Sequence, residues 1–217
     1  MNPPQSIEKL TVAFEGDGDE IRRQLIYSGL LLIIFERFKE YIVDQVDGFF
    51  SDHVEIKDGD LLYTRGQEFK NLIREKGRGN PGDHNNTVFR AALYWFHDLG
   101  AITKAEFDDV ERIYRLRNEI GHDLFRIVAD DKVEAIALHD VVTAFSIYLK
   151  VVRWWIKEVM ATTDPELDPD RTANFDDSES TDTMILRVII RKALVGAMSD
   201  EDIARLVKST ADAVNLS

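Results

Sequence analysis

The feature that most constrains the fold is a repeating three- and four-residue spacing of apolar side chains. Between Asp19 and Phe50 the apolar positions recur at these steps or their multiples: Ile21, Leu25, Leu32, Phe35, Ile42, Val46 and Phe49. The spacing places them on one side of an α-helix, so it predicts a long helix over this segment. Around Leu30 to Phe35 the sequence is apolar on every side, which is typical of the centre of a helical bundle.

Two further helices are predicted on either side of Gly100. The first carries a helical stripe made of Val88, Ala91, Ala92, Trp95, Phe96 and Leu99. Gly100 suits the left-handed position that follows a helix C-terminus. Thr103 and Glu106 then have the spacing of a capping box, so a new helix is expected from Lys104 to about Ile120, stopping at Gly121. The short connection predicts that the two helices pack as neighbours.

The remaining segments complete an all-α prediction. A short helix is expected near Gln67 to Lys76, and a long one from Val133 to Met160. Acidic residues and two prolines then dominate, which is typical of a linker. We therefore expect a four-helix bundle over residues 1–163, an acidic linker over 164–182 and a C-terminal helical hairpin over 183–217. The hairpin is expected to dock onto the bundle or a partner, and its similarity to a helix-turn-helix is slight.

Composition narrows the function classes. The chain has no cysteine, which excludes disulfides and thiolate sites and favours the cytoplasm. A net charge of −13 opposes nucleic-acid binding by overall attraction, so such binding requires a local basic region. The longest apolar run, Gly29 to Phe35, is far shorter than the ~20 residues of a membrane span. Residues 1–14 lack the pattern of a secretion signal.

No cofactor or metal site is expected. No histidine pair, and no pairing of a histidine with a carboxylate, shows a zinc-binding spacing among His53, His84, His97 and His139. The glycine-rich segment Gly77 to Gly82 lacks the Lys-Ser/Thr pair of a nucleotide-binding loop.

Arg117 is the residue that departs most clearly from the helical pattern. Its position lies within about 60° of Val110, Tyr114 and Ile120 on the helix, so a cation stands inside an apolar stripe. Such a cation is either paired in the interior or faces a cleft or an interface. Gly121 is expected to let the chain leave the helix, so that His122 can fold back toward Arg117.

The segment from Arg117 to His122 resembles the hallmark of the HEPN superfamily. That hallmark is an arginine, a polar residue that is often asparagine, and a histidine after four to six intervening residues; this chain has Asn118 and four intervening residues. The resemblance extends over about residues 19–160. It implies a HEPN-like four-helix bundle that forms a homodimer and cuts RNA without a metal, at a site shared by the two subunits.

The resemblance also implies roles for individual residues. Arg117 would bind and stabilise a phosphate, His122 would transfer a proton or position the ribose 2′-oxygen, and Asn118 would orient the site or hold the dimer. An imidazole that titrates near neutrality and a permanently charged guanidinium suit this chemistry. Further cations are predicted to bind the RNA substrate: Lys70, Arg74, Arg78, Arg90 and Arg126. The basic segment around Lys70 is first interpreted as a solvated helix face, and the alternative is a rim that contacts a polyanion.

Two alternatives stay open at this point. The motif could be a structural C-terminal cap, with Arg117 paired to a buried carboxylate and His122 bound to the last carbonyls. The segment from Phe89 to His122 also resembles the mannitol operon repressor family. The first expectation is a toxin-like or phage-defence endoribonuclease with an antitoxin or regulatory protein as partner. The alternative is a non-catalytic regulator or adaptor that works through protein contacts. Some HEPN toxins carry a modifiable tyrosine where this chain has Leu124, which argues against that mode of control.

Overall fold

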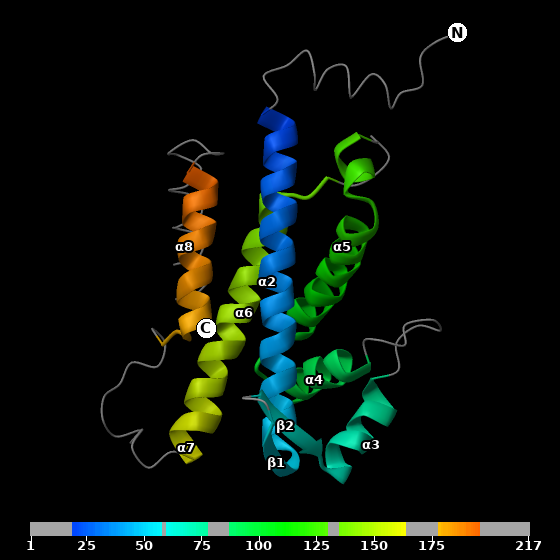
Figure 1. The fold of residues 1–217 in the computed structure, drawn as a ribbon, viewed down its shortest axis with the longest axis vertical. Helices are drawn as coiled ribbons and strands as arrows, with labels where there is room; N and C mark the ends of the chain where they lie inside the picture. Colours follow the sequence, from blue (N-terminus) through cyan, green and yellow to red (C-terminus); the bar gives the residue numbers. More distant parts are fainter. Residues whose placement is uncertain (1–18, 58–59, 78–86, 130–134, 164–177, 196–217) are drawn as a thin grey trace. The chain divides into compact units, whose positions relative to one another are not determined.

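The computed structural model describes residues 19–57, 60–77, 87–129, 135–163 and 178–195, and this part is mostly helical (Figure 1). The chain divides into two compact units. Unit 1 contains Met1–Phe35 and Asp108–Ser217, and unit 2 contains Glu36–Phe107. Among the described residues, no helix combines the length and the apolar character that crossing a membrane would require.

Three helices lie where the periodicity predicts them. They are α2 (Asp19–Phe49), α3 (Gln67–Lys76) and α4 (Thr87–Asp98). Gly100 takes a positive φ of 78°, as expected for a residue that follows a helix end. The capping box before α5 (Lys104–Ala129) is also present, because Thr103 N donates to Glu106 Oε2 at 2.7 Å and Glu106 N donates to Thr103 Oγ1 at 3.3 Å.

The core of unit 1 is formed by one side each of α2, α5, α6 (Leu138–Trp155) and α8 (Thr181–Val195). Its fully or nearly fully buried side chains include Leu31, Ile34, Phe35, Val110, Ile113, Ile120, Val141, Tyr148, Val152, Leu186 and Ile190. The rings of Phe35 and Tyr114 lie 5.8 Å apart and join α2 to α5. Burial of this apolar surface is the main stabilising contribution to the unit.

Helix α6 begins later than the predicted Val133, and two polar side chains, Gln24 and Asp140, explain its start. The buried amide of Gln24 on α2 accepts from Ile136 N at 3.0 Å and donates to Ile136 O at 3.3 Å, which holds Ile136 outside the helix. Asp140 then accepts from Ala137 N at 2.9 Å and from Arg112 Nη1 at 2.6 Å. The carboxylate satisfies a backbone N–H at the helix start and is itself neutralised by a cation. After α6 follow a π-helical turn, Ile156–Met160, and α7, Ala161–Thr163.

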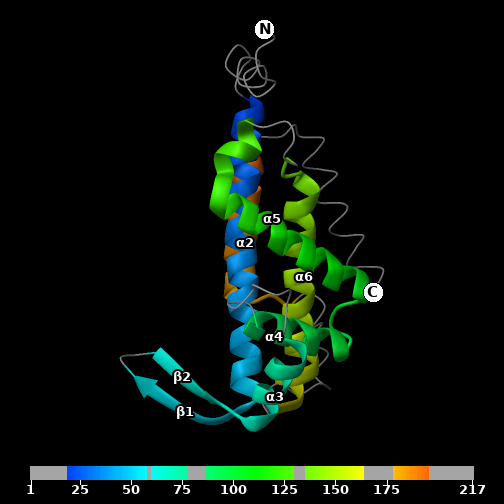
Figure 2. The ribbon, with the colours of Figure 1, turned by 90° about the vertical axis from the view of Figure 1, so that its right-hand side faces the viewer.

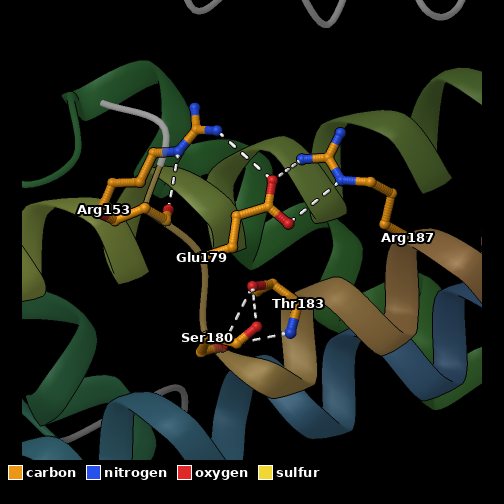
Figure 3. A network of polar contacts seen from close by, with 6 residues as sticks. Arg153, Glu179, Ser180, Thr183 and Arg187 are labelled. Atoms are coloured by element: carbon orange, nitrogen blue, oxygen red, sulfur yellow. Dashed lines mark hydrogen bonds and ion pairs between the residues drawn. The ribbon is translucent and has the colours of Figure 1, made fainter. Parts of the chain in front are cut away.

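Helix α8 docks on α6 through a polar network at its N-terminus (Figure 3). Glu179 lies between Arg153 of α6, at 3.7 Å, and Arg187 of α8, whose Nε donates to the carboxylate at 3.3 Å. Ser180 caps the helix, because its Oγ accepts from Thr183 N at 3.3 Å. The last two residues of the predicted linker thus form the first turn of α8. Residues 164–177 and the predicted helix after Ser199 lie outside the described residues.

Unit 2 contains a β-hairpin that the sequence analysis did not predict. Strand β1 (Ser51–Lys57) pairs antiparallel with β2 (Asp60–Arg65), with Val54 opposite Tyr63 and Ile56 opposite Leu61. Figure 2 shows the two strands extending as a pair. The sequence signal was the Asp58-Gly59 pair between two alternating segments, a combination favoured in tight hairpin turns.

A bidentate ion pair joins the end of α2 to the end of β2 in unit 2. Arg65 Nε and Nη2 donate to the two carboxylate oxygens of Asp47 at 2.6 and 2.7 Å. Asp47 is only 7% exposed, and the Arg65 guanidinium lies 5.8 Å from the centre of the Phe69 ring. The hydrogen bonds to Asp47 raise the pKa of Arg65. The pair therefore neutralises a carboxylate that the fold has removed from water.

Asp44 gives the first testable consequence. Partial loss of solvent around the carboxyl group, followed by the nearby charges of Glu40 and Asp47, raises the pKa of Asp44. A raised pKa means that the folded state binds this proton more readily, so the stability contributed by Asp44 is lost as the pH rises through its folded pKa. Asp44→Asn is expected to raise the free energy of unfolding at pH 7 slightly, by about 0.5 kcal/mol or less because the residue is exposed. Urea unfolding at pH 7 and pH 3.5 checks this, since the gain should fade at the lower pH; a loss of stability at pH 7 would contradict it.

Candidate functional site

Helix α5 does not end at Gly121. It runs unbroken from Lys104 to Ala129, so the predicted helix end and the folding back of His122 are wrong. The apolar stripe explains this, because Leu124 is half-buried and lies within about 40° of buried Ile120 on the helix. A glycine inside a helix costs only about 1 kcal/mol relative to alanine, which continued packing on the same stripe offsets.

An unbroken helix changes the geometry of the motif. Five residues correspond to about 140° around the helix axis, so Arg117 and His122 diverge within one chain. Arg117 is half-buried and its Nη1 donates to Asn118 Oδ1 at 3.2 Å. His122 is exposed and lies one helical turn after Asn118, on the same face. Arg117, Asn118 and His122 therefore form a continuous strip around α5, which we call the motif strip.

Gly121 leaves open space beside the motif strip. A Cβ atom at this position would lie 3.9 Å from Arg117 Nη1 and would meet no other atom that close outside its own helical turn. The helix backbone is exposed there. A glycine next to the guanidinium therefore lets another backbone or a phosphate approach Arg117 closely.

The continuity of α5 can be tested at this glycine. Gly121→Ala is expected to raise the free energy of unfolding by about 0.5–1 kcal/mol, because alanine favours a helix and the added methyl has space. Gly100→Ala is the matched control and should destabilise, because a φ of 78° strains any residue with a side chain. Thermal or urea unfolding measures both. A destabilised Gly121→Ala variant would show that the chain leaves the helix at this residue after all.

The five predicted substrate-binding cations are only partly brought together. Lys70 and Arg74 lie one turn apart on the exposed face of α3, and Arg74 Nη2 donates to Asn71 Oδ1 at 3.0 Å. Arg90 is half-buried on α4, which belongs to the same unit 2. Arg126 lies on α5 in unit 1, where its side chain is outside the described part, and Arg78 lies outside the described residues altogether. The structure thus brings Lys70 and Arg74 together in unit 2, whereas the motif strip belongs to unit 1.

Within the described ranges, no three His, Asp or Glu side chains gather closely enough to hold a metal ion. Comparisons with protein-family models, with curated proteins and with solved structures found no match.

Proposed function

We propose that this chain is a metal-independent endoribonuclease whose active site is completed by two copies of the chain. The observation that carries the proposal is the motif strip, in which a half-buried arginine, an asparagine bonded to it and an exposed histidine follow one another around α5. The resemblance of Arg117 to His122 to the HEPN hallmark supports it. A HEPN-like four-helix bundle and a cytoplasmic location, in keeping with the absence of cysteine, belong to the same proposal.

The divergence within one chain is the reason for requiring two copies. A phosphate held by Arg117 lies about 140° around the helix from His122 of the same chain. Two-fold symmetry can place the exposed His122 of the partner subunit beside that phosphate, and it does so twice. Each site then combines Arg117 of one copy with His122 of the other.

The proposed chemistry is transesterification at the RNA backbone. One imidazole accepts the proton of a ribose 2′-hydroxyl, and the 2′-oxygen then forms a bond to the adjacent phosphorus. The bond from phosphorus to the 5′-oxygen breaks, that oxygen takes a proton from a water molecule, and the imidazolium returns its proton to the solvent. Arg117 stabilises the negative charge that develops on the phosphate oxygens. The products carry a 2′,3′-cyclic phosphate and a 5′-hydroxyl.

The exposed cations of unit 2 are assigned to binding rather than to chemistry. Lys70 and Arg74 present two positive charges one helical turn apart in unit 2, and with Arg90 of the same unit they are suited to binding RNA phosphates. A small antitoxin or regulatory protein is the expected physiological partner of an enzyme that cuts cellular RNA.

A cleavage assay on a broad RNA panel tests the proposal. Cleavage is expected to persist in excess EDTA, the 3′ ends should be cyclic phosphates, and DNA of the same sequence should stay intact because it lacks the 2′-hydroxyl. Mapping the chemical ends of the fragments is the decisive readout. Intact RNA across the whole panel, or fragments that end in a free 3′-hydroxyl, would contradict the proposal.

A second candidate, a non-catalytic regulator or adaptor, is favoured by a different observation. Helix α8 exposes four large apolar side chains: Met184, Ile185, Val188 and Ile189. They lie within one broad face of the helix, and a contiguous exposed apolar surface of this kind is typical of protein contacts. This function predicts that substitutions on α8 disturb partner binding while substitutions at Arg117 and His122 have no effect.

A further inference from the structure

The middle of helix α2, around Leu30 to Phe35, is apolar on every side, and the described part of unit 1 buries one side of it. The side chains of Tyr27, Leu31 and Ile34 are buried in unit 1. Leu25 and Ile33, on the opposite side, are 48% and 45% exposed. A helix segment that is hydrophobic on every face is typical of a fully buried position, yet Leu25 and Ile33 stay about half-exposed beside the described residues of one copy.

The outer face has a pattern that is symmetric about Gly29. Gly29 and six neighbours within about 60° of it around the helix axis form one face, which we call the Gly29 stripe. The stripe consists of Arg22, Leu25, Ile26, Gly29, Leu32, Ile33 and Glu36. Counted from Gly29, the positions three and four residues away are aliphatic in both directions. The positions seven residues away carry opposite charges, positive on one side and negative on the other.

Gly29 itself is open. A Cβ atom added there would meet nothing within 4 Å, so the backbone at the centre of the stripe is accessible from outside. A glycine between two large side chains one turn away on either side forms a shallow notch. Such a notch allows a second helix to cross at close range while the flanking side chains pack beside it.

We propose that the Gly29 stripe is an antiparallel, two-fold interface between two copies of this chain. A two-fold axis at Gly29 places each residue opposite the one at the same distance on the other side, as an isologous interface requires. Leu25 then packs against Ile33 of the partner subunit, and Ile26 packs against Leu32 of the partner subunit. The two glycines meet at the centre.

The charged ends identify the occupant as a second copy. Arg22 lies seven residues before Gly29, and Glu36 lies seven residues after it on the same unbroken helix. The antiparallel arrangement therefore brings Arg22 beside Glu36 of the partner subunit, twice per dimer. A parallel arrangement would instead place like charges together. Within one copy Arg22 contacts Asp19 at 3.2 Å and Glu36 contacts Lys39 at 3.7 Å. Both side chains are still solvent-accessible, with 62% exposure for Arg22 and 36% for Glu36, so they can also contact a partner.

The motif strip on α5 can be placed relative to the Gly29 stripe within unit 1. The evidence for the Gly29 interface does not depend on the proposed nuclease. Helix α5 crosses α2 obliquely and runs in the opposite general direction (Figures 1 and 2), with the rings of Tyr114 and Phe35 5.8 Å apart. His122 follows Tyr114 by eight residues, so it lies farther than Tyr114 toward the N-terminal end of α2. The motif strip of each copy therefore lies toward the part of α2 that carries the Gly29 stripe.

Cysteine scanning in the full-length, cysteine-free chain tests the interface without RNA. Gly29→Cys is expected to form a disulfide-linked dimer on mild oxidation. An equimolar mixture of Leu25→Cys and Ile33→Cys should also cross-link, because these positions lie at the same level in opposite copies. Either of the two alone should not, since its two copies would be separated by about 12 Å along the helices. The exposed Arg23→Cys, about 120° away on α2, is the control.

The expected cross-linked fraction for Gly29→Cys and for the mixture is at least about tenfold above that of Arg23→Cys. A monomer in light scattering together with no cross-linking at Gly29 would overturn the interface, and would mean that another segment or protein covers α2. Cross-linking of Leu25→Cys alone as efficient as the mixture would overturn the antiparallel register. Because no outcome depends on RNA cleavage, failure of the interface and failure of the nuclease proposal are distinguishable.

Discussion

Replacing His122 by alanine is expected to lower the rate of RNA cleavage at least about 100-fold, the usual cost of losing a general acid or base. Arg117→Ala should cost a similar or larger factor, about 100- to 1,000-fold, because the charge that develops on the phosphate loses its stabilising cation. His122 is exposed, so its removal should leave the free energy of unfolding nearly unchanged. Single-turnover cleavage rates measured on variants of confirmed stability give both factors.

Glu119→Ala is the matched control for these variants. Glu119 lies between Arg117 and His122 in the sequence and is exposed on the same helix, but its side chain is not assigned a part in the reaction. Its removal should change the cleavage rate less than about threefold, in line with the small effects of surface substitutions. A His122→Ala variant that cuts RNA as fast as Glu119→Ala would remove the histidine from the mechanism.

The second large effect concerns stability. Arg65→Ala is expected to lower the free energy of unfolding by about 2–3 kcal/mol, because it leaves the buried carboxylate of Asp47 without its cation. The value lies below that of a fully buried pair because Arg65 itself is 38% exposed, so solvent screens part of the interaction. Urea unfolding measures the loss directly.

Arg23→Ala is the control for this loss. Arg23 contacts Glu20 at 2.6 Å, but both side chains are about half-exposed, and such pairs contribute roughly 0–1 kcal/mol. The ion pair of Asp47 would have no special role in unit 2 if the two arginine variants unfolded at the same urea concentration.

Local signals were enough to predict most of the helices. Apolar spacing predicts helix α3. The junction at Gly100 follows from a residue with positive φ and from the Thr103–Glu106 capping box. Each of these signals lies within a few residues of the element that it sets. The start of α6 could not be predicted in this way. It is set by Gln24, more than a hundred residues away in the sequence, and by the contact of Asp140 with Arg112.

The candidate site was predicted in part. The sequence identified Arg117 as a cation inside an apolar stripe, and the structure places it half-buried and bonded to Asn118. The predicted folded-back position of His122 is wrong because Leu124 continues the apolar stripe beyond Gly121 and keeps the chain helical there. The apolar segment around Leu30 to Phe35 predicts the centre of a bundle. The outward-facing stripe about Gly29 can be recognised only from the exposure of Leu25 and Ile33 in the structure.

In the proposed enzyme, Arg117 of one copy acts with His122 of the other. Subunit complementation tests this sharing of the site. The Arg117→Ala and His122→Ala proteins, each inactive alone, are mixed, allowed to exchange subunits and assayed for RNA cleavage. Half of the dimers are then mixed and each has one intact composite site, so the mixture should recover about a quarter of the parent activity. A mixture that stays as inactive as its two components would contradict the shared site.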